Sequence, residues 1–384
     1  MNKKNRKPAI RFKAFNDPWE QRKLGNEATE VIAGGDVDKT SILSKGKFPV
    51  IANALSNDGI IGYYENEFRV KAPAVTVTGR GDVGHAKARE TDFTPVVRLL
   101  SIKTKHNIHF LENAINTLHI VIESTGVPQL TVPQLSQYEL SFPKKLEEEL
   151  RIGAFFRTLD IVITLHQRKL DKLQNVKKAC LEKMFPQNGE SVPRIRFKGF
   201  TDTWEQCKLS SLCSLFTDGD WIESKDQSNF GIRLIQTGNI GITEFIEKIK
   251  SRKWISENTF NRLHCEAVFP GDILISRLPD PAGRACIVPN LKEKMITAVD
   301  CTIARVDAKF CASFLIQSLS TSNYFSFVNT CLAGGTRQRI SRSNLSNYEV
   351  SIPSKKIEQK QIGQYFKLLD SLITLHQREP NLVK

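Results

Sequence analysis

Two stretches of the chain are rich in side chains that can recognise nucleic-acid bases. Arginine, glutamine and asparagine make paired hydrogen bonds to the edges of guanine or adenine. In the second stretch such residues border glycine turns and a Leu-Pro-Asp-Pro loop: Arg233, Gln236, Asn239, Arg277 and Arg284. After a Gly-Gly pair, Thr336, Arg337 and Arg339 are suited to a close approach to the phosphate backbone. Each one could be an ordinary solvated loop residue, but the grouping predicts a surface that binds double-stranded DNA.

In the first stretch, basic residues surround a glycine-rich turn. Residues 79–84 match the pattern G-x-G-x-x-G, which binds dinucleotides when a helix follows it. No helical pattern follows here, because the chain runs toward Pro95 and a further strand. We therefore predict a turn that glycine permits, with nucleotide binding as the alternative. The basic neighbours predicted to face phosphates or base edges are Arg80, His85, Lys87 and Arg89.

The overall charge points to the same class of partner. The chain has 55 Lys and Arg against 41 Asp and Glu, a formal net charge of +14 and a pI near 9.4. This balance favours a polyanion, with nucleic acid ahead of an anionic membrane surface. No run of about 18 apolar residues exists, and the basic start lacks the apolar stretch of a signal peptide. We expect a soluble, cytoplasmic protein with no membrane partner.

Motifs for catalysis and metal binding are missing from the sequence. The eight cysteines form no C-x-x-C pair, so we expect reduced thiols and no metal site. The sequence has no G-x-x-x-x-G-K-S/T loop for ATP and no paired acidic cluster of a nuclease. Residues 16–19 resemble the loop of amino-methyltransferases only faintly, because the second proline of that loop is missing. We therefore predict no catalytic residues and no cofactor bound directly by this chain.

Two sequence blocks each occur twice. Residues 11–24, RFKAFNDPWEQRKL, return at 196–209 as RFKGFTDTWEQCKL, with 10 of 14 positions identical. Residues 152–168 return at 362–378, with 11 of 17 positions identical. The stretches between the blocks do not resemble each other, and the second is longer by 25 residues. A constant frame around unlike inserts predicts two halves with one docking geometry and different surfaces, whereas the alternative is a duplication whose halves merely diverged.

Each copy of the first block fits the start of a helix. Asp17 stands at the N-cap and Glu20, three residues on, completes a capping box. The second copy repeats this pattern from Asp202. Trp19 and Trp204 are then predicted to anchor the packing of the frame.

The second block belongs to a long helix. From about Lys144 to Phe185, apolar residues alternate in spacings of four and three, which is the pattern of a coiled-coil seam. Such a helix spans about 60 Å and needs a partner along its apolar side. The second copy supplies that partner, and we predict antiparallel packing. The seam positions are Ile152, Phe156, Leu159, Ile163 and His166 in the first helix, and Ile362, Phe366, Leu369, Ile373 and His376 in the second.

Two features give this seam its detail. His166 and His376 occupy equivalent positions, where a polar side chain sets the register between helices. A metal or acid-base role is the weaker alternative, since no carboxylate or second type of ligand accompanies them. Pro380 stands where Leu170 stands in the first copy, and because proline cannot continue a helix interior, the second helix is predicted to be shorter.

The inserts indicate mixed α/β (α+β) domains. Short β-rich runs alternate with Gly, Asn, Asp and Pro, which does not suit a doubly wound sheet. The predicted fold is two globular recognition domains separated by two long antiparallel coiled-coil helices, with a pseudo-twofold internal repeat. The recognition domains are residues 1–143 and 191–353, the central spacer helix is 144–190, and the shortened C-terminal spacer helix is 354–384.

Both repeated blocks resemble those of one known family, the specificity subunits of type I restriction-modification enzymes. The likeness covers residues 8–378. It implies that the inserts are target-recognition domains, each reading one half of a split DNA sequence, and that the helices fix the gap between the halves. It also implies docking of two modification (methyltransferase) subunits that use S-adenosylmethionine to methylate adenine in DNA. Separate restriction (translocase and nuclease) subunits would use ATP and Mg.

Two other classes of function are open on the residues alone. A DNA-binding regulator would use the same two recognition domains without enzyme partners. A self-contained methyltransferase or nuclease would need cofactor loops that the sequence does not contain. The first class predicts sequence-specific binding without methylation, and the second predicts retention of a methyl donor by the isolated chain.

Overall fold

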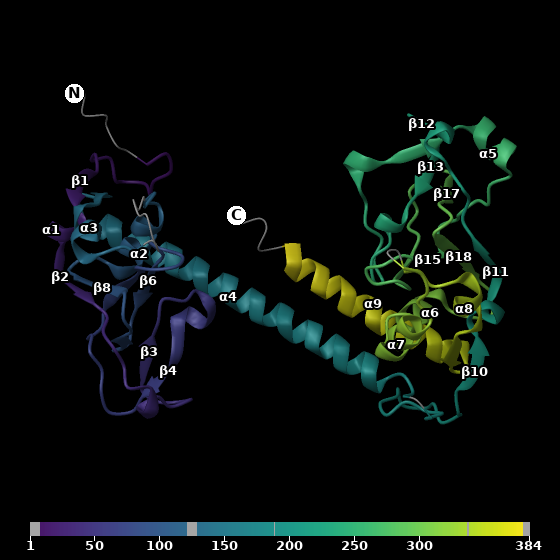
Figure 1. Cartoon of the computed structure of the whole chain (residues 1–384), viewed down its shortest axis with the longest axis horizontal. Helices are drawn as coiled ribbons and strands as arrows, with labels where there is room; N and C mark the ends of the chain where they lie inside the picture. The colour runs from purple at the N-terminus through teal and green to yellow at the C-terminus, as the bar shows by residue number, and fades with distance from the viewer. Residues whose placement is uncertain (1–7, 121–128, 188, 336–337, 379–384) are drawn as a thin grey trace. The chain divides into compact units, whose positions relative to one another are not determined.

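The computed structural model describes residues 8–120, 129–187, 189–335 and 338–378 (Figure 1). The chain forms two compact units, Met1–Leu165 and His166–Lys384. The long helix α4 (Leu146–Lys183) contributes residues to both. Among the described residues, none of the helices combines the length and the apolar character needed to cross a bilayer.

Unit 1 folds around two small sheets, beside a third sheet of only two strands. Its elements are β1 (Glu20–Lys23), α1 (Leu24–Glu27), β2 (Ala28–Ala33), β3 (Phe48–Ile51), β4 (Ile60–Tyr64), β5 (Ala74–Thr78), β6 (Ala86–Arg89), β7 (Thr94–Pro95), β8 (Leu99–Thr104), α2 (Ile108–Asn116), α3 (Val132–Gln137), β9 (Glu139–Phe142) and the start of α4. The larger sheet is antiparallel with the order β2-β8-β5-β6. The smaller has the order β4-β3-β7, with β3 and β7 parallel. Alternate residues of β5 bury Val75 and Val77 in one core with Leu111 and Ile115 of α2.

Unit 2 repeats this plan with additional elements. They are β10 (Glu205–Lys208), β11 (Cys213–Asp218), β12 (Gln227–Ser228), β13 (Ile232–Ile235), β14 (Lys253–Ile255), α5 (Glu257–Leu263), β15 (Ile273–Ser276), β16 (Ala285–Ile287), β17 (Met295–Thr297), β18 (Cys301–Val306), α6 (Ala312–Ser318), α7 (Ser322–Thr330), α8 (Arg342–Asn347), β19 (Glu349–Ile352) and α9 (Lys356–Arg378). Its larger sheet has the order β11-β18-β15-β16, and its smaller sheet the order β12-β14-β13-β17.

The two inserts share one topology although their sequences differ. β11, β18, β15 and β16 occupy the places of β2, β8, β5 and β6 in the first unit. β13 pairs antiparallel with β14 and parallel with β17, as β3 does with β4 and β7. Many apolar sequences satisfy the same alternation of buried and exposed positions, so this likeness leaves little trace in the residues.

The predicted helix starts at Asp17 and Asp202 are wrong. Residues 20–23 form β1, which pairs antiparallel with β9, and β10 pairs with β19 in the equivalent register. A distant strand supplies the backbone hydrogen bonds that a local capping pattern would have supplied to a helix. The predicted role of the tryptophans is confirmed, because Trp204 is buried in the core and the Trp19 ring packs 5.8 Å from that of Phe110.

The predicted long helices are present and pack antiparallel within unit 2. α4 has 38 residues, within the predicted limits, and α9 has 23 described residues. Lys177 Nζ lies 2.5 Å from Asp370 Oδ1, and the Phe185 ring lies 5.9 Å from that of Phe366. Residue numbers therefore rise along α4 as they fall along α9. Pro380, on which the predicted shortening rests, lies outside the described residues.

The cysteines are unpaired. All eight are free thiols, and burial raises the pKa of Cys286 and of Cys301 to about 12. These two thiols therefore stay protonated and pack as small apolar groups. In the part of the chain that the structure describes, no group of three or more His, Cys, Asp or Glu side chains could hold a metal ion.

Candidate nucleic-acid interface

A β-hairpin carries the four candidate residues of unit 1. β5 and β6 pair antiparallel, and residues 79–85 form the connection between them. Gly81 and Gly84 have φ values of +76° and +90°, a conformation that glycine adopts without strain. A strand and not a helix follows this turn, so the segment lacks the structural context of a dinucleotide site.

The hairpin presents a basic face. His85, Lys87 and Arg89 are alternate residues and border one small pocket, which places them on the same side of β6. Arg80, in the turn, and His85 are exposed, whereas Lys87 and Arg89 are half-buried. The structure therefore brings the four predicted residues together along one hairpin.

Two of these four side chains already have partners inside unit 1. Arg89 Nε donates to Thr76 Oγ1 at 3.0 Å, and its Nη2 donates to the carbonyl oxygen of Asp58 at 2.9 Å. Burial lowers the pKa of the Arg89 guanidinium. Lys87 Nζ lies 3.6 Å from Glu112 Oε1. Arg80 and His85 are therefore the candidates best able to reach a ligand from this hairpin.

In unit 2, Arg233 is an interior residue and not part of an exposed loop. It lies on β13 between β14 and β17 and is 2% exposed. Its Nη2 donates to Glu247 Oε1 at 3.1 Å, and its guanidinium lies 5.5 Å from the centre of the Trp254 ring. Because its neighbours cover it, this side chain cannot reach a base in the present conformation.

Arg284 and Asn239 hold loops together. The Arg284 guanidinium donates to the carbonyl oxygens of Ile240 at 2.7 Å, Leu278 at 2.8 Å and Thr237 at 3.0 Å. Its burial among these groups lowers its pKa. These donors are consumed within the chain, so Arg284 has little capacity left for DNA.

Asn239 uses both ends of its amide. Its Oδ1 accepts from the backbone N–H of Gln236 at 3.0 Å, and its Nδ2 donates to the carbonyl oxygen of Ile246 at 2.8 Å. The side chain is 5% exposed. Its role is therefore to shape the turn, while the Gln236 side chain beside it is half-buried.

The remaining candidates divide by exposure. Arg277 is 9% exposed and donates to the carbonyl oxygen of Val299 at 2.8 Å. Arg339 has a half-exposed side chain, with Nη1 3.4 Å from Asp300 Oδ1. Thr336 and Arg337 lie outside the described residues. Among the described candidates of unit 2, Arg339 is the basic side chain most available to a ligand.

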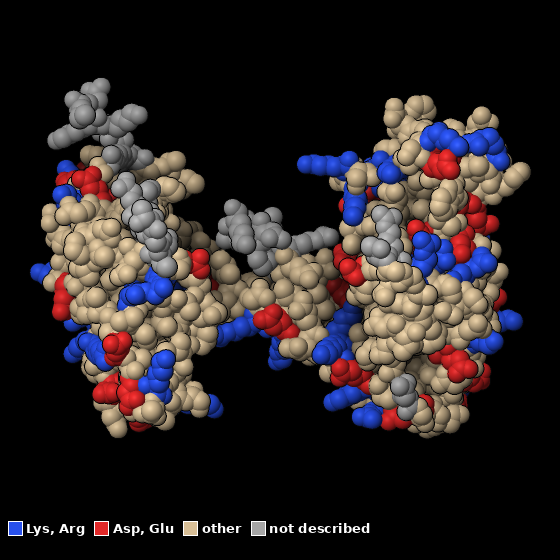
Figure 2. Space-filling view, viewed as in Figure 1, with Lys and Arg blue, Asp and Glu red and all other residues tan. Residues whose placement is uncertain are grey.

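Sequence reasoning missed a basic segment between β13 and β14. Lys248, Lys250 and Arg252 lie at alternate positions there, and Lys248 and Lys250 are exposed. Figure 2 shows Lys and Arg side chains gathered at the end of unit 2 that carries β12 and β13. The signal was present as a short run of Lys and Arg, which is typical of nucleic-acid-binding patches.

The predicted seam is covered over only part of its length. On α9, Ile362, Phe366, Leu369 and His376 are buried and Ile373 is half-buried, while on α4 Ile152, Leu159 and His166 are half-buried. By contrast, Phe156 is 38% exposed and Ile163 is 40% exposed. The prediction is wrong at these two positions: in the described part of the chain, α9 bonds to α4 at His166, Lys177 and Cys180, so Phe156 and Ile163 are not buried in the seam.

The two seam histidines meet each other. Nδ1 of His166 lies 3.3 Å from Nδ1 of His376. Equivalent residues of the two copies therefore face each other across the antiparallel helix pair.

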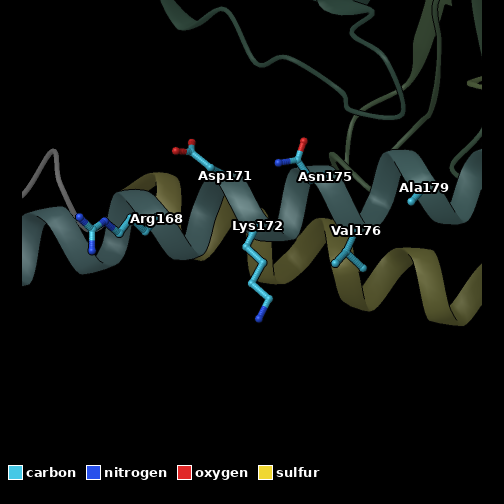
Figure 3. Close-up of a pocket in the computed structure, with 6 residues that line it drawn as sticks. All are labelled: Arg168, Asp171, Lys172, Asn175, Val176 and Ala179. Atoms are coloured by element: carbon cyan, nitrogen blue, oxygen red, sulfur yellow. The ribbon is translucent and has the colours of Figure 1, made fainter. Parts of the chain in front are cut away.

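One face of α4 in unit 2 is open. A shallow hollow is lined by Arg168, Asp171, Lys172, Asn175, Val176 and Ala179, which recur every three or four residues (Figure 3). Figure 3 shows Asp171 and Asn175 pointing to one side of the helix and Lys172 to the other. Lining residues all come from α4, so this surface of the helix remains exposed beside its pairing with α9.

Comparison with known proteins identifies a family model that matches both halves of the chain and two relatives that match part of it. The family model for the type I restriction modification DNA specificity domain matches residues 16–175 and 201–384. A candidate type I specificity subunit of Mycoplasma pneumoniae is 30% identical over 145 residues, which are 36% of this chain and 38% of the relative. The specificity subunit of the type I restriction enzyme MjaVIII of Methanocaldococcus jannaschii is 20% identical over 271 residues, 68% of this chain and 62% of the relative. The aligned part thus spans less than two thirds of either relative.

Solved structures share the fold. The S subunit of a type I restriction-modification system from M. genitalium matches with a TM-score of 0.67 and 13% identity, over 96% of this chain and 93% of that chain. A structure described for complex assembly and conformational transition of the type I R-M system matches with a TM-score of 0.51 and 15% identity, over 95% and 93%. These likenesses confirm the predicted fold class.

Proposed function

Because the chain belongs to the type I restriction-modification DNA specificity family, we propose that it selects the DNA sequence on which such a system acts. Recognition domain 1 (residues 1–143) and recognition domain 2 (residues 191–353) each bind one half of an asymmetric, two-part site in double-stranded DNA. The chain does no chemistry alone, and the complex acts in the cytoplasm.

The observation that carries this proposal is one fold used twice with different side chains at its surface. The larger sheets have the same strand order in the two units. Yet the hairpin β5–β6 presents Arg80 and His85, whereas in the corresponding hairpin β15–β16 Arg284 is bound to loop carbonyl groups. Two copies of one scaffold with unlike surfaces suit a site whose two halves differ in sequence.

The helices support a fixed gap between the half-sites. α4 has 38 residues, so it is about 57 Å long at 1.5 Å per residue. Its later part is braced against α9 by buried apolar residues and by the Lys177–Asp370 ion pair. Half-sites on one face of DNA lie about 34 Å apart, or a multiple of that spacing. A braced helix holds such a distance better than a flexible linker would.

Exposed apolar residues support docking of two like partners. Val162 and Leu165 of α4 are 43% and 57% exposed. Their equivalents in the repeat, Leu372 and Leu375 of α9, are 44% and 53% exposed. Large apolar side chains that recur on both copies of a helix are typical of interaction surfaces. We assign these faces to two modification subunits, which use S-adenosylmethionine, and restriction subunits that use ATP and Mg complete the complex.

Methylation mapping tests this proposal directly. The chain is co-expressed with a modification subunit of its own system, and methylated adenines are mapped across the host DNA by single-molecule sequencing. The expected result is one motif with two unlike parts and a constant gap. Cells that express the modification subunit without this chain are the control.

A variant sharpens the assignment of halves to domains. Arg80→Ala combined with His85→Ala changes recognition domain 1 alone, so it should relax or abolish selection of one half-site and leave the other half unchanged. A motif without two parts would contradict the two-domain proposal. Specific DNA binding without any methylation would instead favour a DNA-binding regulator.

A further inference from the structure

The two recognition domains differ strongly in the connection that follows their central strands. In unit 1, β3 ends at Ile51 and β4 begins at Ile60, and the residues between them include no Lys or Arg. In unit 2, β13 ends at Ile235 and β14 begins at Lys253. The longer connection contains Lys248, Lys250 and Arg252. An insertion into a shared scaffold has therefore added basic residues to one domain only.

The inserted connection has a defined shape. Ile240 and Phe245 form an antiparallel bridge, and the backbone N–H of Ile246 donates to the carbonyl oxygen of Asn239 at 2.8 Å. A single 3-10 turn, Ile249–Ser251, then leads into β14. We name residues 247–252 the basic arm. Its tip is exposed, since Ile249 is 71% exposed and lies between two exposed lysines.

Two arginines neutralise Glu247, the acidic residue at the start of the basic arm. Glu247 Oε1 accepts from Arg233 Nη2 at 3.1 Å and from Arg252 Nε at 3.0 Å. One carboxylate therefore faces two guanidinium groups. Lys248 and Lys250 are left as the charges that the basic arm offers to solvent.

The buried side chain of Arg233, which bonds to Glu247, adds to the positive electrostatic potential of the basic arm. Arg233 is 2% exposed, and neither its Nε nor its Nη1 has a hydrogen-bond partner among the described residues. A charge at low dielectric is weakly screened, so it acts over a longer distance than an exposed lysine. The guanidinium thus attracts an anion held above it without touching the anion.

We propose that the basic arm is a phosphate-binding element through which recognition domain 2 grips the DNA backbone. Lys248 and Lys250 each bind a phosphate, and Arg252 supports the arm by its bond to Glu247. The corresponding connection of recognition domain 1 has no equivalent residues. The proposal rests on the proposed function. It adds sequence-independent contacts to the DNA backbone at one half-site only. Backbone contacts position a protein on the duplex without carrying base specificity.

Salt dependence of binding tests the proposal. The full chain is titrated with a fluorescent duplex carrying the recognised motif and with a duplex of unrelated sequence, at several salt concentrations. The logarithm of the binding constant falls as the logarithm of the salt concentration rises, and each phosphate contact adds about 1 to the steepness of this fall, which is called the slope below. Lys248→Gln with Lys250→Gln should therefore lower the slope by about 2 on both duplexes. Arg252 is left intact because it supports the arm.

A matched control uses two exposed lysines of unit 2 outside the basic arm. Lys198→Gln with Lys309→Gln changes the net charge by the same amount and should leave the slope within about 0.5 of the unaltered chain. A slope unchanged by the arm variant would overturn the proposal, as would a loss confined to the motif, which would make the lysines base contacts. If the unaltered chain binds both duplexes equally and the arm variant still lowers the slope, the basic arm stands and the proposed sequence selection fails.

Discussion

The two copies of the repeated frame hold their recognition domains with the same buried ion pair. In unit 1, Arg11 Nη2 donates to Glu148 Oε2 at 2.7 Å, and in unit 2, Arg196 Nη2 donates to Glu358 Oε2 at 2.9 Å. Both carboxylates are 1% exposed. β1–β9 and β10–β19 share one register beside them. The first repeated block supplies the arginine of each pair, and the glutamate stands four residues before the second block, so a change at either position would leave the other side chain without its partner.

At the next residue of each helix the copies diverge. Glu149 accepts from the backbone N–H of Asn107, and its Oε2 lies 2.8 Å from His106 Nδ1. In unit 2, Gln359 Oε1 accepts from the backbone N–H of Cys311 at 3.0 Å. The frame therefore requires an acceptor at this position and tolerates either a charged or a neutral one. In unit 1 a titratable histidine, His106, also contacts this acceptor, whereas in unit 2 the equivalent contact involves no charged group.

Removing the shared carboxylate should have the largest effect on either unit. Glu148→Ala or Glu358→Ala leaves a guanidinium without its counter-charge and should lower the free energy of unfolding of its own unit by about 3 to 5 kcal/mol. Denaturant unfolding followed by peptide-resolved hydrogen exchange measures each unit separately. Glu147→Ala, which removes only the exposed ion pair with Arg151, should change the free energy of unfolding of unit 1 by less than about 1 kcal/mol. Similar losses for Glu147→Ala and Glu148→Ala would contradict the importance of burial.

Replacing the closely packed glycine in the first turns of each long helix with alanine should have an intermediate effect on the free energy of unfolding. A Cβ on Gly153 would lie 2.0 Å from Asn107 Oδ1, and one on Gly363 would lie 2.3 Å from Ser313 Oγ and 2.7 Å from its backbone carbon. Gly153→Ala and Gly363→Ala should each cost about 1 to 3 kcal/mol of unfolding free energy, measured as above. The cost should be larger at Gly363, because backbone atoms yield less than a side chain.

Gly335→Ala is the control for this pair, because no atom of the described residues outside its chain neighbours lies within 4 Å of a Cβ at that position. Its unfolding free energy should stay within about 0.5 kcal/mol of the unaltered chain. Equal stability of Gly153→Ala would mean that Asn107 moves aside, and that the helix contact is looser in unit 1 than in unit 2.

The smallest expected difference is in pH dependence. Hydrogen bonding to Glu149 raises the pKa of His106 above its ordinary 6.5, with a further contribution from Glu27. A raised pKa in the folded state gives stabilisation that is complete below the unfolded value and is lost as the pH rises through the folded value. Hydrogen-exchange protection of α2 should therefore decline as the pH increases above about 6.5, after correction for the intrinsic exchange rate.

Unit 2 provides the internal reference for this titration. Protection of α6, whose N-terminus bonds to Gln359, should not follow the same titration. Glu149→Gln should flatten the pH dependence of α2 while keeping the acceptor for Asn107. A pH dependence of α2 that survives Glu149→Gln would assign it to another group.

The sequence predicted well those features that depend on local pattern. The two repeated blocks, the limits of α4 and the turn at residues 79–84 each follow from residues close together in the chain. The helix starts predicted at Asp17 and Asp202 failed for the converse reason, since β1 and β10 are strands only because β9 and β19, more than one hundred residues later, pair with them.

The candidate nucleic-acid interface likewise depends on contacts between residues that are far apart in the chain. By itself, the sequence determined that the chain repeats a frame, that its long helices need partners and that its charge suits a polyanion, because periodicity and composition require no knowledge of distant contacts. Only the tertiary structure decided which basic residues face solvent. Arg284 bonds to Ile240, which lies 44 residues earlier, and Arg233 is covered by neighbouring strands, whereas Lys248 and Lys250 remain exposed. The burial of an arginine is settled by acceptors and strands far along the chain, and residue type alone does not reveal it.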